Sequence, residues 1–280
     1  MAVVVTKAPL THVRAVVQAA REVAGYADLL RNLVVRDLKL RYRGSVLGFA
    51  WSLLNPLLMM LVFTLVFQVL AGNPSIDRYP FFLMAALVPW LFTQHALTAA
   101  MRSVTSNAQL IKKVYFPREL LPVSAVLASF VNFVLAFGVF WVIGLAFGVG
   151  SSPAMLFVPV IMLLQLALVL GIGLILAALN VFFRDTEHLV EVGLLAWFFL
   201  TPVFYAMSVV PNHTFLGLDV HRWVFTLNPM ATLVTDYRYA SMWGFLPIRH
   251  TLVTVVIAAV AVGAGWWMFR RLAPRFAEEL

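Results

Sequence analysis

The sequence predicts an all-α integral membrane protein with six transmembrane helices, and three observations lead to this fold class. Hydrophobic residues make up 62% of the 280 residues and charged residues only 11%, whereas soluble domains are nearer to half apolar and a quarter charged. Six stretches are long, apolar and free of Asp, Glu, Lys and Arg, as expected of helices that cross a bilayer. The Lys and Arg residues are concentrated on one side of these stretches.

The amino-terminal region divides into a tail and a basic amphipathic helix. Residues 1–26 contain no apolar run of signal-peptide length, so we expect an uncleaved cytoplasmic tail. A helix over 27–44 would place four aliphatic residues on one side, Leu30, Leu33, Val34 and Leu38. Such a helix lies in the membrane interface, either as a plain lipid anchor or as a collar around a pore entrance. Gly44 and Gly48 would let the chain turn from lying flat to spanning.

The whole chain, 1–280, is expected to form one transmembrane domain. The six spans cover about 47–71, 80–101, 120–149, 154–179, 192–209 and 250–269. The third is long enough to tilt, and Pro202 inside the short fifth span indicates a break. Gly144 with Gly148, and the run Ala258–Gly265, would allow close helix packing, either between two copies or within one.

The distribution of positive charge gives the spans a direction. Sixteen of the twenty Lys and Arg residues lie on one side of the predicted spans, and only Arg78, Arg222, Arg238 and Arg249 lie on the other. Positive residues stay in the cytoplasm. We therefore expect both termini and the second loop, 102–119, to be cytoplasmic.

The segment 210–249 is expected to be external and re-entrant. As a full span it would bury Asp236 or Arg238, at about 2.5–3.5 kcal/mol each near the bilayer centre. Two short re-entrant or interfacial pieces, separated near Asn228 and Pro229, avoid this cost. Broken backbone of this kind is tolerated only beside protein or a watery cavity, so the segment is expected to border a pathway.

The second loop carries more than a connector between two spans needs. Five apolar residues stand together in it: Leu110, Ile111, Val114, Tyr115 and Phe116. The charged residues among them are Lys112, Lys113, Arg118 and Glu119. This combination on the cytoplasmic side predicts a docking surface for another polypeptide.

Several kinds of chemistry are missing from the sequence. There is no cysteine, which excludes disulfides and thiolate metal sites. No Walker A pattern occurs, so the chain does not bind ATP through a P-loop. The expected spans hold no carboxylate, and His95 is the one histidine that lies clearly inside a span, which argues against proton-driven transport. No selectivity motif indicates a channel. Uphill transport would therefore draw its energy from a partner ATPase.

Three stretches resemble the membrane subunit of ABC-2 type exporters, specifically the permeases for O-antigen, teichoic acid, capsule, galactan and related bacterial surface polysaccharides. They are RDLKLRYRGSVLGFAWSLLNPLL (36–58), NAQLIKKVYFPRELLPVSAVLASFVNF (107–133) and NVFFRDTEHLVEVGLLAWFFLTPVFY (180–205), with LNPM (227–230) following. The resemblance implies a permease subunit, not an enzyme, in the bacterial inner membrane. It would export a lipid-linked polysaccharide, with ATP and Mg²⁺ held by a separate subunit and no cofactor in this chain.

The resemblance also implies roles for particular cytoplasmic residues. The second loop would be a coupling helix that inserts into the ATPase subunit, comprising Gln109, Leu110, Ile111, Lys112, Lys113, Val114, Tyr115, Phe116, Pro117 and Arg118, with Pro117 ending the helix. A second contact would come from Arg184, Asp185 and Glu187, although acidic residues there also suit the positive end of the following helix. The amino-terminal helix would act as an interface or gate helix through Arg36, Asp37, Lys39, Arg41, Tyr42 and Arg43.

Two copies of the chain are expected, because six helices enclose too little space for a polysaccharide. The resemblance points to the first and fifth spans as the walls of the channel between the two copies, with Trp51, Asn55, Met59, Phe63, Trp197, Phe198, Thr201, Phe204 and Tyr205 lining it. Aromatic faces let a sugar ring slide without trapping it, but aromatic residues near span ends also serve as interface anchors. The expected partners are the second copy, two ATPase subunits, the lipid-linked polysaccharide and membrane lipids, and no nucleic acid.

Two alternative functions stay open at this point. An ABC-2 exporter of drugs or simple lipids would share the fold. A membrane enzyme acting on a lipid-linked sugar would use the outer acidic and histidine residues, Asp77, Asp219, Asp236, His213 and His221. Their spacing marks no nucleophile, general base or metal site.

Overall fold

The computed structural model describes residues 25–48, 50–70, 76, 78–206, 214–215, 218–219, 227–244 and 248–280. Its α-helices are α2 (Ala27–Tyr42), α3 (Ala50–Thr64), α4 (Tyr79–Ser103), α5 (Ala108–Lys113), α6 (Leu120–Ala146), α7 (Val158–Phe182), α8 (Thr186–Leu200), α10 (Pro229–Arg238), α11 (Ile248–Leu272) and α12 (Phe276–Glu279). Short 3-10 turns cover Thr105–Asn107, Pro153–Phe157 and Ala273–Arg275, and π-helical turns cover Leu65–Leu70 and Tyr239–Trp243. Two-residue strands, β1 (Thr214–Phe215) and β2 (Leu218–Asp219), pair antiparallel. Of the predicted tail, only Gly25 and Tyr26 are described.

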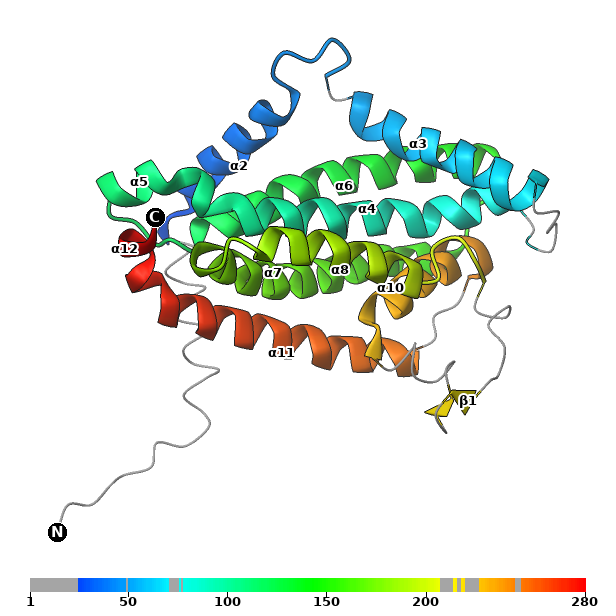
Figure 1. The fold of residues 1–280 in the computed structure, drawn as a ribbon. Helices are drawn as coiled ribbons and strands as arrows, with labels where there is room; N and C mark the ends of the chain where they lie inside the picture. Colours follow the sequence, from blue (N-terminus) through cyan, green and yellow to red (C-terminus); the bar gives the residue numbers. More distant parts are fainter. Residues whose placement is uncertain are drawn as a thin grey trace.

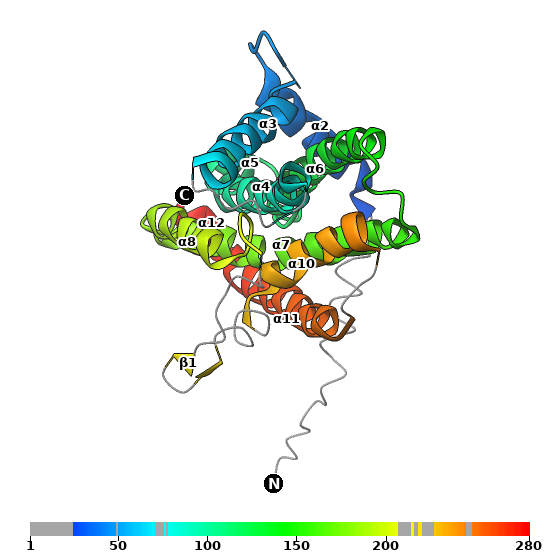
Figure 2. The same ribbon diagram turned by 90° about the vertical axis from the view of Figure 1, so that its right-hand side faces the viewer.

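The long helices run side by side around α4 (Figure 1). Viewed from the end, α3, α4 and α6 lie on one side of the bundle, α7, α8 and α10 on the other, and α11 beyond α7 (Figure 2). Most of α4 is buried, because it packs against both α6 and α7. By contrast, α3 with the π-turn after it buries only Pro56. The helix that carries four of the nine predicted channel residues is therefore the least buried of the long helices.

Within the described residues, five helices are long and apolar enough to cross a membrane: Ala50–Leu70, Tyr79–Ser103, Leu120–Ala146, Pro153–Phe182 and His250–Glu279. They coincide with five of the six predicted spans, and the all-helical character of the bundle is confirmed. The predicted fifth span corresponds to α8, which begins six residues earlier and ends nine residues earlier than expected.

The shortness of α8 has a local cause. Its 15 residues span about 22 Å, less than the roughly 30 Å of a bilayer core. The helix stops because Thr201 precedes Pro202 and adopts an extended conformation, with φ −97° and ψ 132°, as a residue before proline prefers. The count of six spans stays a prediction.

The amino-terminal helix α2 runs along α6. Asp37 accepts a hydrogen bond from Ser124 at 3.3 Å, and Tyr42 donates one to Asn132 at 2.9 Å, so the two helices stay together over about 12 Å of α6. The predicted apolar side faces the protein, and Leu33 is buried. After α2 the chain turns at Gly44 and Gly48, whose φ angles are +78° and +49°. Glycine adopts such angles without the strain that a side chain would add.

The small-residue run Ala258–Gly265 packs within a single copy. A Cβ added at Gly265 would lie 2.2 Å from the carbonyl oxygen of Gly171 on α7, and a Cβ at Gly171 would lie 2.3 Å from the backbone of Ala261. Helices α7 and α11 therefore touch backbone to backbone, which only glycine permits. The Gly144 and Gly148 pair takes no part in this contact, because Gly144 faces Val149 at the turn that follows its own helix.

This contact makes Gly265→Ala a destabilising change. The added methyl group would force α7 and α11 apart, which should cost about 1–3 kcal/mol of stability and lower the midpoint of thermal unfolding of the detergent-purified protein. Gly263→Ala is the matched control on the same helix. No atom lies within 4 Å of a Cβ built there, and alanine favours helix by about 1 kcal/mol over glycine. Equal unfolding midpoints for the two variants would contradict the backbone contact.

Helix α10 occupies the segment that was expected to be re-entrant. The Asn228 side chain caps it by accepting hydrogen bonds from the Met230 and Ala231 amides at 3.1 and 3.2 Å, so α10 begins directly after Asn228. Residues 220–226 lie outside the described residues, and the pair of re-entrant pieces stays a prediction. Both charged residues are buried by protein. Asp236 accepts a hydrogen bond from Thr251 at 2.9 Å.

Arg238 joins three parts of the chain. Its guanidinium donates to the carbonyl oxygens of Phe82 at 3.1 Å, Pro202 at 2.6 Å and Val203 at 2.5 Å. It also lies 3.5 Å from the centre of the Phe82 ring. The carbonyls of Pro202 and Val203 follow the carboxyl end of α8, where a positive charge is favourable. The buried cation is therefore satisfied by backbone dipoles and an aromatic face.

Candidate functional site

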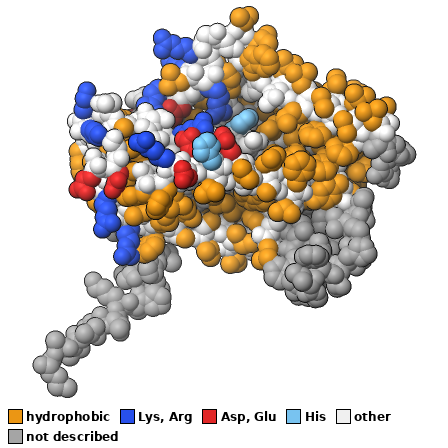
Figure 3. Space-filling model, viewed as in Figure 1, with side chains coloured by type: hydrophobic (Ala, Val, Ile, Leu, Met, Phe, Trp, Pro, Cys, Tyr) orange, Lys and Arg blue, Asp and Glu red, His pale blue; other side chains and the backbone are white. Residues whose placement is uncertain are grey.

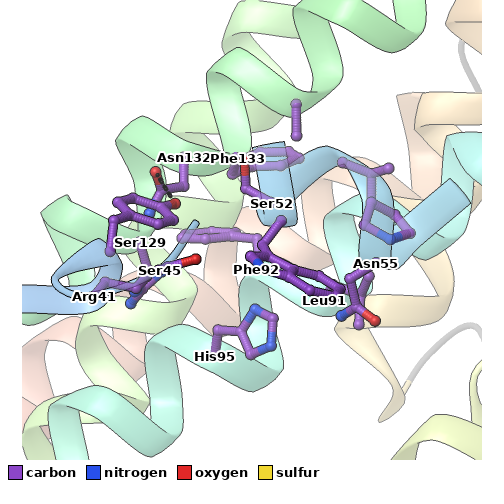
Figure 4. A pocket seen from close by; sticks show the side chains of 15 residues that line it. Arg41, Ser45, Ser52, Asn55, Leu91, Phe92, His95, Ser129, Asn132 and Phe133 are labelled. Carbon is purple, nitrogen blue, oxygen red and sulfur yellow. Dashed lines mark hydrogen bonds between the residues drawn. The ribbon is translucent and has the colours of Figure 1, made fainter. Parts of the chain in front are cut away.

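A cavity of about 270 Å³ lies between α2, α3, α4 and α6 (Figure 4). Its walls are formed by Arg41, Tyr42, Ser45, Trp51, Ser52, Asn55, Pro56, Val88, Leu91, Phe92, His95, Ser129, Asn132, Phe133 and Ala136. It therefore brings two residues of the predicted gate helix, Arg41 and Tyr42, beside two predicted channel residues, Trp51 and Asn55. The two sets were predicted separately from the sequence, and the fold joins them at one site.

The polar lining of this cavity is rich in hydrogen-bond donors. Arg41 donates to the Ser129 hydroxyl at 3.0 Å, and Tyr42 donates to the Asn132 carbonyl oxygen at 2.9 Å. The Asn132 amide nitrogen is buried and has no hydrogen-bond partner among the described residues. The side chain of His95 is exposed and stands in the same space (Figure 4). No Asp or Glu belongs to the described lining.

The sequence signals for part of this site were weak. His95 stood out as the ionisable residue of an apolar span, but Ser45, Ser52, Ser129 and Asn132 did not stand out as site residues. Polar residues at positions 129 and 132 of a long apolar helix were the available signal. Their meaning depends on α2, which packs alongside and supplies the partners Arg41 and Tyr42.

Of the other predicted gate-helix residues, two form hydrogen bonds within the chain and two are exposed. Arg36 donates to Asn107 at 3.0 Å and pairs with Asp37 at 2.9 Å, which ties α2 to the second loop. Lys39 and Arg43 are exposed. The helix is thus attached to both α6 and the loop that precedes α5.

The two predicted channel walls meet through aromatic rings. Phe63 lies 6.2 Å from Phe198 and 6.3 Å from Phe204, measured between ring centres, and Phe67 stacks on Phe204 at 4.9 Å. Met59 packs against the same core, and Tyr205 lies 5.1 Å from Phe204. The described part of the structure thereby places α3 beside the end of α8, as a shared wall requires.

Two predicted channel residues take part in hydrogen bonds at the end of α8, and one of them, Thr201, does not line a channel. Thr201 is fully buried and donates to the carbonyl oxygen of Trp197 at 2.7 Å. Trp197 donates its indole N–H to Asn228 at 2.8 Å, and Asn228 also donates to the Thr201 hydroxyl at 3.1 Å. Helical alignment with Trp197 suggested that Thr201 faces a channel. The helix ends at Leu200, however, so that alignment does not extend to residue 201.

The proposed docking loop presents a small exposed tip. Tyr115 is 100% exposed and Val114 is 53% exposed, and Gln109, Lys112 and Lys113 are exposed beside them. Such a tip, with one aromatic ring, one aliphatic side chain and two lysines, is free to contact another polypeptide. Leu110 is partly buried.

Two of the five apolar residues predicted for docking are buried inside the chain. Ile111 is 6% exposed and Phe116 is 7% exposed, and both belong to an apolar cluster that we call the loop anchor, formed with Leu33, Phe269 and Phe276. They therefore position the loop rather than contact a partner. Helix α5 ends at Lys113, four residues before Pro117, so Pro117 does not end it.

Polar contacts hold the same loop to the carboxyl-terminal helices. Arg118 donates a hydrogen bond to the carbonyl oxygen of Ala273. Glu119 pairs with Arg270 at 2.8 Å, and Arg270 also lies over the Trp266 ring at 5.6 Å. The loop is thus fixed on one side by α2 and on the other by α11 and α12.

The predicted second contact lies between α7 and α8. Arg184 and Asp185 are exposed, whereas Glu187 pairs with Arg102 at 3.1 Å. Glu187 occupies the first turn of α8, where an acidic residue favours the helix. Only Arg184 and Asp185 are therefore free to contact a partner.

The residues required by the enzyme alternative do not form a site in the described structure. Asp77, His213 and His221 lie outside the described residues, as does the side chain of Asp219. Asp236 is buried against Thr251. No group of three or more His, Cys, Asp or Glu side chains suited to a metal occurs among the residues that the structure describes.

Comparison with known proteins identifies the family. Residues 28–242 match the model of the ABC-2 type transporter family. The chain is 36% identical over 265 residues to an O-antigen export system permease of Myxococcus xanthus, covering 94% of this chain and 100% of the relative. It is 33% identical over 256 residues to an O-antigen export permease of Klebsiella pneumoniae, covering 90% and 95%. A polysialic acid transport protein of Escherichia coli is 21% identical over 241 residues, covering 80% and 88%. The chain therefore belongs to the ABC-2 type transporter family.

Proposed function

We propose that the protein is the transmembrane subunit of an ATP-driven exporter that moves a lipid-linked polysaccharide out of the cytoplasm across the bacterial inner membrane. The observation that carries this proposal is the exposed loop tip at Lys112, Lys113, Val114 and Tyr115, held on the buried loop anchor. A loop that is rigid at its base and exposed at its tip suits the transfer of motion from a partner. The names of the relatives support a polysaccharide as the cargo.

The distribution of charged side chains supports an orientation in which both the docking loop and the carboxyl terminus face the cytoplasm. Lys, Arg, Asp and Glu side chains gather at the end of the molecule that carries α2, α5 and α12, while apolar side chains cover the rest of the same face (Figure 3). Under the positive-inside rule this end faces the cytoplasm. The docking tip and the carboxyl terminus lie together at this end (Figure 1).

The proposed channel requires a second copy of the chain. Helix α3 exposes Trp51, Leu58, Leu61 and Val62, and α8 exposes Leu195 and Phe199. In a homodimer these faces of α3 and α8 would meet their counterparts and enclose the polysaccharide, with an ATPase subunit on each copy. Asn55 and Trp51 lie at the cytoplasmic start of this path, beside the cavity.

Affinity purification from native membranes tests the proposal. The chain should bring down a polypeptide that carries a Walker A motif, and depletion of the chain should cause a lipid-linked glycan to accumulate on the cytoplasmic side. If no ATPase associates, the exporter proposal fails. Accumulation of a drug or a simple lipid instead of a glycan would favour the related exporter class. Turnover of a lipid-linked sugar by the purified chain alone would favour the enzyme.

A further inference from the structure

We infer that the cavity between α2, α3, α4 and α6 binds the phosphoryl group of a lipid phosphate, the part of a lipid-linked glycan that joins the lipid to the sugar. The inference deepens the proposed function and rests on it for the identity of the cargo. It assigns to each copy of the chain a recognition site for the lipid half of its substrate.

The cavity wall offers one cationic side chain and several hydrogen-bond donors. Arg41 contributes a guanidinium, of which one N–H is used on Ser129, and a guanidinium has five donors. Asn55 and His95 can donate as well, in either neutral tautomer of the histidine. A ligand that meets one permanent cation and several donors must offer negative oxygens, and phosphoryl oxygens are well suited to both.

The amide nitrogen of Asn132, in the cavity wall, lacks a hydrogen-bond partner in the described structure. Asn132 is 7% exposed, and its carbonyl oxygen is occupied by Tyr42 at 2.9 Å, while the amide nitrogen has no partner in the described structure. A buried donor without an acceptor costs about 1–3 kcal/mol. Asn132 is part of the cavity wall, so a small shift of its side chain would let an anionic oxygen in the cavity accept from this nitrogen. Because the Tyr42 hydroxyl donates to the amide oxygen, the nitrogen is the atom of this amide that is left without a partner in the described structure.

The lining of the cavity is unsuited to two other kinds of ligand, a metal ion and an acyl chain. Mg²⁺ and Ca²⁺ sites rely on carboxylate oxygens, and Zn²⁺ takes three or four Cys, His, Asp or Glu ligands, whereas the described lining offers His95 and no Asp or Glu. An acyl chain would suit an apolar cavity instead, and such a cavity exists. It measures about 330 Å³, shares Pro56, Val88 and Ala136 with the first, and has only apolar side chains in its wall. A donor-rich and an apolar cavity side by side suit an amphipathic ligand with a phosphate head.

The cavity can be reached by a lipid headgroup from the membrane side. Trp51 and Asn55 of α3 line the cavity and are themselves exposed. The chain turns sharply at Gly44 and Gly48 between α2 and α3, so the cavity opens beside the point where the chain passes from the gate helix to the first span. A lipid headgroup can therefore reach Arg41 without crossing the bundle core.

Binding of polyprenyl phosphate to the purified full-length chain tests the inference. The chain is reconstituted in phosphatidylcholine nanodiscs and titrated with radiolabelled polyprenyl phosphate. Asn132→Asp keeps the oxygen that accepts from Tyr42 but replaces the free donor with a negative charge, so it should weaken binding about tenfold or more, or ~1.4 kcal/mol. Arg41→Gln should weaken it by a similar factor. Size-exclusion profiles confirm that each variant remains folded.

Arg31→Gln is the matched control, because Arg31 lies on the same helix, is exposed and does not line the cavity. It should bind as the wild type does, and uncharged polyprenol should bind at least tenfold more weakly than polyprenyl phosphate. Unchanged affinity in Asn132→Asp, or an equal loss in Arg31→Gln, would overturn the site. If inorganic phosphate or phosphatidylglycerol displaced the radiolabelled ligand as well as unlabelled polyprenyl phosphate does, the assignment of the site to the lipid carrier would be overturned. The measurement uses the chain alone, so a missing ATPase partner would defeat the proposed function without changing this result.

Discussion

Replacing Lys112, Lys113 and Tyr115 together with alanine is expected to abolish glycan export while the protein stays folded. All three side chains are exposed at the tip of the proposed docking loop, so their removal breaks no internal contact of the described structure. Central aromatic residues of an interface often contribute 2 kcal/mol or more to binding. Loss of Tyr115 and both lysines should therefore reduce the affinity for the ATPase at least about thirtyfold.

The experiment measures ATP hydrolysis and glycan export by the ATPase and permease reconstituted together in vesicles. A matched triple variant, Arg275→Ala with Glu278→Ala and Glu279→Ala, changes three exposed side chains at the same end and should retain export. Ile111→Ala provides a different comparison. It should destabilise the fold by about 2–5 kcal/mol, because Ile111 belongs to the loop anchor. Export at the wild-type rate by the first triple variant would show that the tip does not dock.

Arg238→Met is expected to destabilise the fold by about 3 kcal/mol or more. Methionine fills much of the space but leaves the carbonyl oxygens of Phe82, Pro202 and Val203 without their donors, and each buried unsatisfied group costs about 1–3 kcal/mol. The end of α8 would lose its link to α4 and α10. Thermal unfolding of the detergent-purified protein, followed by loss of monodisperse material, should show the lower midpoint.

Two comparisons make the result specific to the three carbonyls. Arg238→Lys keeps the charge but lacks the planar fork of donors, so its midpoint should fall between those of the wild type and Arg238→Met. Arg31→Met changes an exposed arginine and should leave the midpoint unchanged. A wild-type midpoint for Arg238→Met would mean that these hydrogen bonds contribute nothing to stability.

The spans were predictable because length and the absence of charge determine what can cross a bilayer. The exception is α8, where a single residue pair decides the outcome. Thr201 adopts the extended conformation that Pro202 favours, and the predicted helix continued through it. Pro202 was recognised as a break, but the sequence alone does not show how much of the stretch lies on each side of it.

The candidate site was predictable in its parts and not in its assembly. Arg41 and Asn55 were assigned to two different functions, and nothing in a helical pattern places Asn132 between them. In the loop, Ile111 and Phe116 look as suitable for docking as Tyr115 does. Their burial depends on Phe276, which lies 160 residues further along the chain than Phe116. Long-range contacts of this kind leave no periodic trace in the sequence.

The anchoring of the docking loop has a mechanical consequence. Tyr115 is fully exposed, but the next residue, Phe116, is buried in the loop anchor, to which Leu33 and Phe276 also belong, and Glu119 forms an ion pair with Arg270. If an ATPase subunit docks on the tyrosine ring as proposed, the contacts of the loop would pass its motion to α2 and α11 rather than to a free loop. The close backbone contact between Gly265 of α11 and Gly171 of α7 would extend that motion to α7.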